Sequence, residues 1–434
     1  MSFFRSILGG VNALHCLPIE EIEKSDDVDK EARKKELNYP GKVVSLPSNP
    51  THLGLNSDET TLAVCVKIKQ IPHIYLFDTR HFLESGEIKP FLEIPGVTPP
   101  GVSLKELAWN PVLPYSMALV FTNGMLAMYL VKTDGSKFDV STLYEGISCV
   151  SWSPKGKQLV AGKTNGKLTQ YKPDLAEAKT MEPPGTGFSA LSILWISTYQ
   201  FLVCYGNGNE RPGLFLAQGS KTGPTTFINY DDICYSTGEQ NPAYFSMIQI
   251  PDWSLIISGS HNAMEIGVIG SEDAGKNWLQ WLLPDSGRAE LPLKSNNDER
   301  YPVGMALALC SSRKLPLEEN NFMPFSMPIL FTLSEDGLLC GFYSVNQRPN
   351  AAQVTKIEAQ PNLENVRKGI VNVPTAVPKN LIKQLEAPPA FSTSFTASTP
   401  IKPALPNPPL ISKPPGNFRI FITLGKPFFF HLCI

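Results

Sequence analysis

A segment of 43 residues repeats along the middle of the chain and restricts the folds open to it. Two copies, at residues 104–131 and 147–173, read as an apolar strand, tryptophan, an Asn-Pro or Ser-Pro turn, a second apolar strand, an Asn-Gly turn and a third strand. Trp109 and Trp152 are equivalent, and Trp195 follows at the same spacing. A period of roughly 40–45 residues is typical of a four-stranded β-propeller blade. Because one blade cannot bury both its faces alone, such blades stack in a ring.

The turns inside the repeat favour the same fold. Asn123-Gly124 and Asn165-Gly166 are dipeptides that supply positive φ angles in a two-residue hairpin turn. More divergent copies of the repeat lie at residues 52–80, 247–270 and 327–345. The chain is therefore predicted to be all-β, a seven-bladed WD40-like β-propeller with six substantial blades and a largely missing first blade. We expect the three tryptophans to be buried at equivalent places in successive blades.

Composition divides the chain into five parts. These are a remnant of the first blade (1–18), a charged insertion (19–39), the propeller blades (40–346), an extended segment (347–373) and a disordered Pro-rich linker with an anomalous apolar C-terminus (374–434). The insertion suits either a docking helix or a solvated surface segment, and the solvated segment is favoured. Eleven prolines between residues 374 and 417 cannot belong to a packed core. The apolar residues 418–434 suggest no physical role.

Charge and cysteine usage exclude several classes of protein. The formal net charge is −2, so nothing global draws the chain to nucleic acid or an anionic membrane. Eight cysteines without a CxxC pair are expected to be reduced thiols of a cytosolic or nuclear protein, not disulfides or zinc ligands. No apolar run approaches the roughly 20 residues of a membrane span. The first sixteen residues make only a poor signal peptide.

No pattern of residues predicts a catalytic, cofactor or metal site. Residues 156–164, GKQLVAGKT, look like a phosphate-binding loop. However, five residues instead of four separate Gly156 from Gly162, and a hairpin turn follows where a helix is required. Six histidines are scattered without metal-ligand spacing, and HExxH and GxSxG are absent. We therefore expect no enzyme. A propeller hydrolase remains an alternative, because polar residues around a central channel need no local motif.

The most distinctive charged segment joins two expected blades at residues 281–304, WLLPDSGRAELPLKSNNDERYPVG, and is called the charged loop below. Its charged residues are Asp285, Arg288, Glu290, Lys294, Asp298, Glu299 and Arg300. The residues alone suit a solvated loop and a partner-binding loop equally. Long loops on rigid scaffolds often carry binding residues. Charges in such a loop govern partner choice and association rate more than affinity.

Four stretches make the chain resemble one known family. They are LAWNPVLP (107–114), SWSPKGKQLVAGKTNGKLTQY (151–171), WLLPDSGRAELP (281–292) and DGLLCGFYSVNQRP (336–349). In these stretches the chain is similar to the N-terminal domain of the nucleoporin 214 (CAN) family, which belongs to the cytoplasmic face of the nuclear pore complex. The similarity runs in order from about residue 9 to about residue 365 and so covers most of the chain.

The resemblance implies a fold and a partner. The family's fold is a seven-bladed propeller followed by an extended segment that folds back onto it, here residues 347–373. Its propeller docks the DEAD-box RNA helicase of mRNA export. The helicase surface involved overlaps its RNA-binding face, so docking would compete with RNA. By position, the contact residues are Asp285, Arg288, Asp298 and Glu299, with Glu290 beside them.

The same resemblance implies a nucleoporin in nucleocytoplasmic transport, with no direct nucleic-acid binding and no membrane insertion. Other nucleoporins would be contacted through regions that this chain lacks. Family members begin with about one more blade of residues. We therefore expect open sheet edges instead of a stable closed ring. The alternative is a generic WD40-type interaction scaffold with a different partner.

Overall fold

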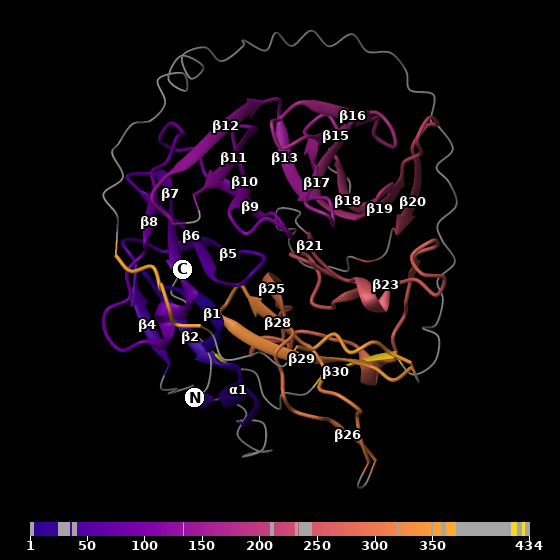
Figure 1. Ribbon diagram of the computed structural model, residues 1–434. Helices are drawn as coiled ribbons and strands as arrows, with labels where there is room; N and C mark the ends of the chain where they lie inside the picture. The colour runs from indigo at the N-terminus through magenta and orange to yellow at the C-terminus, as the bar shows by residue number, and fades with distance from the viewer. Residues whose placement is uncertain are drawn as a thin grey trace.

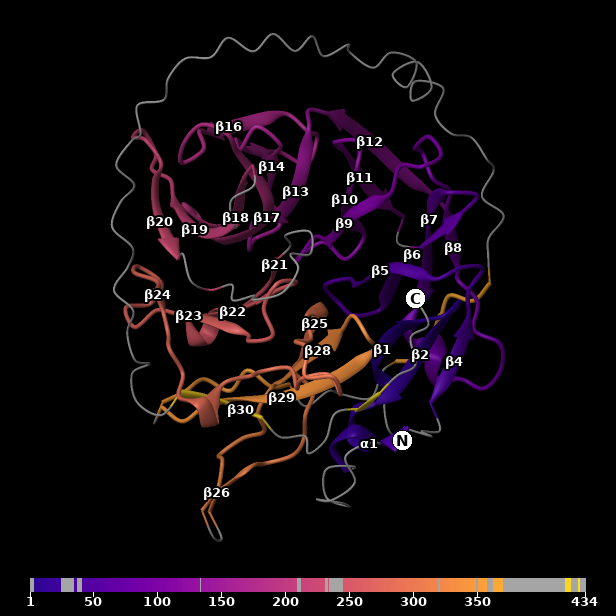
Figure 2. The same cartoon turned by 180° about the vertical axis from the view of Figure 1, so that it is seen from behind.

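Seven β-sheets are arranged in a ring (Figures 1 and 2). The structure is a computed structural model, and it describes residues 4–24, 35–36, 41–132, 134–208, 212–230, 233, 245–318, 321–348, 350–356, 362–369, 418–422 and 428–429. The predicted all-β, seven-bladed propeller is confirmed. We number the blades 1 to 7 in chain order.

Blades 2 to 6 are four-stranded antiparallel sheets whose strands pair in sequence order. Their strands are β5–β8 (Pro50–Leu55, Thr61–Ile68, Ile71–Asp78, Leu92–Ile94), β9–β12 (Leu104–Trp109, Ser116–Phe121, Met125–Val131, Phe138–Tyr144), β13–β16 (Ile147–Trp152, Leu159–Lys163, Leu168–Tyr171, Glu177–Met181), β17–β20 (Phe188–Ser197, Gln200–Asn207, Gly213–Gln218, Thr226–Tyr230) and β21–β24 (Phe245–Ile250, Leu255–Ser260, Gly267–Gly270, Leu279–Gln280). The first strands of neighbouring blades contact one another, so these strands line the centre of the ring.

Blades 1 and 7 meet where the ring closes. Blade 1 consists of β1 (Phe4–Gly10), β2 (Ala13–Pro18) and β4 (Lys42–Ser45), with helix α1 (Ile19–Lys24) after β2. Blade 7 consists of β25 (Pro302–Ala308), β28 (Ile329–Ser334) and β29 (Leu338–Asn346), with β30 (Phe418–Ile422), β31 (Phe428–Phe429) and β3 (Lys35–Glu36) outside β29. The strands β26 (Pro316–Glu318) and β27 (Asn321–Phe322) form a separate hairpin.

One buried carboxylate ties the N-terminal segment to blade 7. The side chain of Glu23, in α1, accepts hydrogen bonds from Ser311 Oγ at 2.6 Å and from the Tyr343 hydroxyl at 2.9 Å. Arg313 Nη1 donates to the Glu23 carbonyl at 3.1 Å. Beside Glu23, Ile19 and Ile22 are buried in an apolar cluster that includes residues of blades 6 and 7. Polar and apolar contacts therefore join the two ends of the ring.

Three sequence-based expectations about this region differ from the structure. Residues 1–18 were predicted to be a remnant of a largely missing first blade, but they supply β1 and β2, and β4 pairs with β2 to give a three-stranded blade. Residues 19–39 were expected to be a solvated insertion, but Ile19, Ile22 and Glu23 are buried. The charged composition of the insertion hid the apolar face of a six-residue helix. The expectation that the ring stays open is also wrong, because Glu23 and its neighbours connect blades 1 and 7.

The apolar C-terminal segment pairs with the outer edge of blade 7. β30 runs antiparallel to β29, with Ile422 opposite Phe342, and β31 pairs with the start of β29. The backbone of a segment without an evident role in the sequence thus extends a sheet. The Pro-rich residues 374–417, expected to be a disordered linker, lie outside the described residues.

Apolar side chains fill the space between neighbouring blades. In blade 3, every residue of β10 is buried, and so are six of the seven residues of β11. Ala63 and Leu76 of blade 2 pack in one cluster with Met117 and Ala127 of blade 3. A sheet covered on both faces needs near-continuous apolar strands, which is what these sequences supply.

The repeat tryptophans link successive blades, with differences between them. Trp109 Nε1 donates to the Gly54 carbonyl of blade 2, and Trp152 Nε1 donates to the Ala108 carbonyl of blade 3, both at 3.0 Å. Trp195 is buried, but its Nε1 donates within its own blade, to Ser197. Burial is therefore confirmed for Trp152 and Trp195, whereas Trp109 is only half-buried. Trp109 lines an open pocket, described below.

The Asn-Gly turns differ in type from the prediction. Only the glycines have positive φ, 79° for both Gly124 and Gly166, so these are not two-residue turns with two positive angles. Gly124 N–H donates to the Phe121 carbonyl at 3.0 Å, which is the geometry of a type I turn followed by a left-handed glycine. A Cβ on Gly124 would lie 2.9 Å from the backbone of Gly146, so glycine is also needed for the close approach.

Residues after blade 7 run along one end of the ring. We call the described residues 350–356 and 362–369 the return segment. Trp253, in η3 (Pro251–Trp253) of blade 6, donates from Nε1 to the Ala352 carbonyl at 2.8 Å. Thr355 Oγ1 donates to the Ser326 carbonyl of blade 7 at 2.9 Å. The return segment therefore crosses more than one blade (Figure 1).

We predict that Glu23→Ala destabilises the propeller. The substitution removes the acceptor of two hydrogen bonds in a buried site, which costs about 1–3 kcal/mol. The free energy of unfolding, measured by chemical denaturation, should fall by this amount. Glu20→Ala on the exposed face of the same helix is the control. An equal loss of stability in both variants would contradict the assignment of Glu23 as the closing residue.

We also predict that Trp152→Ala costs about 3–5 kcal/mol, because it leaves a cavity between blades and removes the hydrogen bond to Ala108. Thermal or chemical unfolding measures the loss. Tyr199→Ala, which truncates an exposed aromatic residue, should cost far less. Similar losses in the two variants would show that Trp152 does not connect the blades.

Candidate protein-docking site

The charged loop connects β24 of blade 6 to β25 of blade 7 and is anchored by its apolar residues. Trp281, Leu283, Ala289 and Leu291 are buried in the cluster shared by blades 6 and 7. The 3-10 helix η4 (Asp285–Gly287) lies between these anchors. The apolar residues face inward and hold the backbone, so the charged side chains project from a packed base.

The first half of the loop carries three of the predicted contact residues. The Asp285 side chain is 92% exposed and forms an ion pair with Arg288. Arg288 Nη1 also reaches Glu265 of blade 6, at 3.1 Å. Glu290 is exposed, and its backbone bridges to that of Glu265. Arg288 thus lies between Asp285 and Glu265, and Glu290 lies beside Glu265. Glu265 was not among the predicted residues because it lies outside the loop.

The second half of the loop carries the other two predicted residues. Asp298 is exposed, and its carboxylate accepts a hydrogen bond from Asn296 Nδ2 at 2.6 Å. Glu299 is half-buried, and its carboxylate accepts from the Tyr301 hydroxyl at 3.0 Å. The Lys294 N–H donates to the Asp298 carbonyl at 2.8 Å, which closes the turn that presents Asp298.

Arg300 holds the second half of the loop against blade 7. Its side chain is only 6% exposed, and its Nε contacts Asp336 at 2.8 Å. Its Nη1 donates to the carbonyls of Pro292 and Leu293, at 2.7 and 2.6 Å. From the sequence, Arg300 was predicted to be one of the charged residues of the loop and not an anchor. Its partner Asp336 lies in the turn between β28 and β29, far from Arg300 in the sequence, so no local pattern identifies the pair.

The anchoring pairs shift the pKa values of their members. Burial acts to raise the pKa of Asp336, but hydrogen bonds from Ser334 and Arg300 and the charge of Arg300 outweigh it and lower that pKa below its ordinary value. The hydrogen bond from Lys294 to Glu335, at 2.7 Å, raises the pKa of Lys294. Asp336 and Lys294 are therefore charged at neutral pH.

The outer surface of the charged loop is acidic. Arg288, Lys294 and Arg300 each contact a carboxylate, whereas Glu290 and Asp298 project into solvent. A cavity of about 360 Å³ opens beside Arg288, and Glu265, Gln280, Trp281 and Leu282 are among its lining residues. This arrangement suits a basic partner surface that also offers an apolar side chain.

Other site types find little support in the described part of the chain. Residues 159–163 of the segment that looks like a phosphate loop form β14, and a Cβ on Gly162 would lie 2.5 Å from Cys149 Sγ. No group of three or more metal-ligating side chains occurs among the described residues. In the same residues, no helix is long and apolar enough to cross a membrane.

The described cysteines are free thiols. Burial raises the pKa of Cys16 to about 12 and that of Cys65 to about 11. Thiols with such pKa values remain protonated at neutral pH, and the thiolate is the nucleophile. These residues therefore belong to the core and not to a reactive centre.

Comparison with known sequences identifies the family. A family model described as the NUP159/214 beta propeller matches residues 12–339. The chain belongs to the NUP159/214 β-propeller family. It is 35% identical over 323 residues to "Nuclear pore complex protein Nup214" of Drosophila melanogaster, covering 72% of this chain and 19% of that protein. It is 28% identical over 375 residues to the Homo sapiens protein of the same name, covering 83% and 18%.

The family includes a fungal nucleoporin, and a more distant WD40 protein shares only the fold. "Nucleoporin NUP159" of Chaetomium thermophilum is 28% identical over 375 residues, covering 77% of this chain and 25% of that protein. The chain thus spans a quarter or less of these three relatives. The WD40 domain of Toxoplasma gondii coronin shares the propeller fold alone, with a TM-score of 0.53, 10% identity and coverage of 79% and 78%.

We predict that the Asp336–Arg300 pair stabilises the protein at neutral pH and stops doing so in acid. Because the pKa of Asp336 is lowered on folding, its contribution is complete above the ordinary carboxyl pKa of about 4 and is lost as the pH falls through the folded value. The difference in the free energy of unfolding between the natural protein and Asp336→Asn should shrink below about pH 4. Asp298→Asn is the control in the same loop. A difference that stays constant from pH 7 into acid would contradict this.

Proposed function

We propose that this nucleoporin acts at the cytoplasmic face of the nuclear pore complex as a docking platform for the DEAD-box RNA helicase of mRNA export. The observation that carries the proposal is the anchored acidic surface of the charged loop. Relatives named as nuclear pore complex proteins support a location at the pore. Other nucleoporins would be its partners within the pore. The role is binding, without catalysis.

The loop is organised for binding before a partner arrives. Arg300 and the buried Trp281, Leu283 and Leu291 hold the backbone, so little conformational entropy is lost on docking. Glu290 and Asp298 remain available to attract cationic side chains and raise the association rate. The cavity beside Arg288 offers a place for one apolar anchor of the partner.

Docking on an acidic surface would compete with RNA. A helicase binds the RNA backbone with basic side chains, because phosphates dominate nucleic-acid affinity. Carboxylates such as Asp298 and Glu290 present the same sign of charge to those side chains. A helicase docked here would therefore release RNA, which suits the exit side of the pore.

We predict that Glu290→Lys combined with Asp298→Lys weakens binding of the purified helicase about 10-fold or more at low salt, because each exposed ionic contact is both lost and reversed. Affinity is measured with immobilised propeller and helicase in solution. Glu177→Lys with Glu272→Lys, two exposed positions elsewhere, is the matched control and should leave affinity unchanged.

The same measurement separates the proposal from its alternative. RNA added to the helicase should reduce its binding to the natural propeller. If the helicase fails to bind at low salt, a generic WD40-type scaffold with a different partner is favoured. If it binds the doubly reversed variant as well as the natural protein, the charged loop is not the docking site.

A further inference from the structure

A second pocket lies at the end of the ring opposite the charged loop. It has a volume of about 440 Å³ and is formed by blades 2 and 3 together with the return segment. The charged loop joins the last strand of one blade to the first strand of the next. The pocket is bordered by the β5–β6 and β9–β10 connections, which join first strands to second strands. In antiparallel sheets these two kinds of connection lie at opposite ends.

The inner wall of this pocket is apolar and aromatic. Leu76, Phe91 and Val131 are buried, whereas Trp109 and Tyr115 are half-buried and expose part of their rings. Trp109 is thus less buried than its counterpart Trp152, even though both indoles donate the same inter-blade hydrogen bond. The pocket accounts for this difference, because it leaves one side of Trp109 open.

Hydrogen bonds hold the wall in place. Asn56 Nδ2 donates to the Pro114 carbonyl at 2.9 Å, across the boundary between blades 2 and 3. The N–H of Thr61 donates to Asn56 Oδ1 at 2.9 Å, so the asparagine also closes its own turn. The pocket is therefore formed before any ligand enters it.

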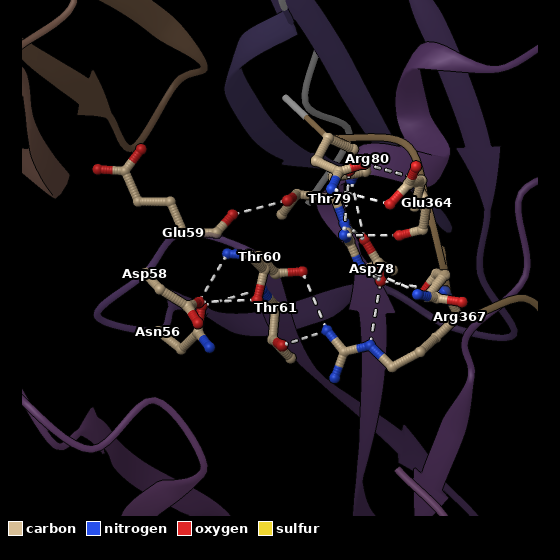
Figure 3. Close-up of polar contacts among 12 residues, drawn as sticks. Asn56, Asp58, Glu59, Thr60, Thr61, Asp78, Thr79, Arg80, Glu364 and Arg367 are labelled. Atoms are coloured by element: carbon tan, nitrogen blue, oxygen red, sulfur yellow. Dashed lines mark hydrogen bonds and ion pairs between the residues drawn. The ribbon is translucent and has the colours of Figure 1, made fainter. Parts of the chain in front are cut away.

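The return segment completes the pocket with Arg367. Figure 3 shows Arg367 and Arg80 converging on Asp78, whose side chain is fully buried. Arg367 Nε donates to Asp78 Oδ2 at 3.0 Å, and the Arg367 guanidinium lies 4.0 Å from the centre of the Phe91 ring. Arg80 Nη2 donates to the same carboxylate oxygen at 2.8 Å. Other N–H groups of the two arginines donate to neutral acceptors, such as the Asn362 carbonyl for Arg80 and the Thr60 carbonyl for Arg367.

The rim of the pocket is acidic, in contrast to the apolar inner wall. Asp58 and Asp134 are exposed there, and each accepts hydrogen bonds only from the turn that follows it, from Thr60 and Ser136 respectively. Lys132 also lines the pocket but forms an ion pair with Asp139 at 3.2 Å. Among the described residues, no cation lies within ion-pair distance of Asp58 or Asp134. The charge presented to a ligand is therefore negative.

Apolar side chains extend the pocket onto the surface. Val112 and Leu113, in the β9–β10 turn beside Pro114, are 53% and 37% exposed. Leu55, at the end of β5, is 45% exposed. An accessible aromatic wall, a rigid boundary, exposed aliphatic residues and two free carboxylates thus occur at one place.

We propose that this pocket binds an extended segment of a partner protein that presents an aliphatic or aromatic side chain followed by lysine or arginine. The apolar side chain fills the space against Trp109 and Tyr115. The basic residue then reaches Asp58 and Asp134 at the rim. Phosphorylated ligands are disfavoured, because the rim is acidic and the guanidinium groups of the wall already donate to Asp78 and to backbone carbonyls. The site lies apart from the charged loop and does not depend on helicase docking.

The test uses the full chain and three fluorescein-labelled peptides, Ser-Leu-Pro-Arg-Lys-Ser, Ser-Leu-Pro-Glu-Glu-Ser and Ser-Gly-Pro-Arg-Lys-Ser, with binding measured by fluorescence anisotropy. The first peptide should bind at least about 10-fold more tightly than the third, because glycine cannot fill the apolar wall. It should also bind at least about 10-fold more tightly than the second, because glutamates face Asp58 and Asp134.

Variants of the rim separate this site from the rest of the surface. Asp58→Asn with Asp134→Asn keeps side chains that can accept the hydrogen bonds of the two turns. This double variant should lower the affinity for the first peptide about 5-fold. Asp174→Asn with Glu177→Gln, at exposed positions of blade 4, is the matched control and should have no effect. Helicase binding should be unchanged in both variants, which keeps a failure here distinct from a failure of the docking proposal.

Three results would overturn the proposal. The first is equal binding of the basic and acidic peptides, and the second is unchanged binding by the rim variant. The third is dimerisation of the chain that the rim variant abolishes, which would make a second copy the occupant.

Discussion

Each blade of this propeller is apolar on both faces and needs a neighbour on either side, so the ring must close. Closure depends on the contact of α1 with blade 7, where the Glu23 carboxylate accepts hydrogen bonds from Ser311 and Tyr343. A carboxylate is buried at low cost only when its oxygens are satisfied. The surrounding apolar cluster, with Ile19 and Ile22, supplies the stabilising burial at the same place. The apolar cluster therefore stabilises the contact between α1 and blade 7, and the hydrogen bonds of Glu23 fix its geometry.

A closed ring makes its two ends into rigid supports. At one end, Arg300 fastens the charged loop to blade 7 and leaves Glu290 and Asp298 in solvent. At the other end, Arg367 fastens the return segment to Asp78 of blade 2. In both places a nearly buried acid–base pair positions the backbone, and exposed carboxylates remain for partners. Such pairs favour a single geometry more than they add stability, because desolvation offsets much of their attraction.

Several features of the fold were predictable from local sequence, and others were not. Trp109 and Trp152 mark the blade period, and Gly124 and Gly166 mark turns that need a positive φ, so the all-β ring followed from short patterns. The five candidate contact residues were found from the charged loop and a family resemblance, and their role remains a prediction. Arg300 could not be recognised as an anchor, because its partner Asp336 lies 36 residues away and surface and buried arginines look alike in a sequence.

The sequence by itself determined the blade period, the strand pattern and the family, because these depend on residues close together in the chain. Tertiary structure alone decided that Glu23, in the charged segment after β2, is buried against blade 7, since Glu23 and Tyr343 are 320 residues apart. It also decided that Trp109 lines an open pocket, whereas Trp152 is buried. The physical reason is the same in each case. Burial and pairing are properties of the neighbours that a fold brings together, and those neighbours have no local signature.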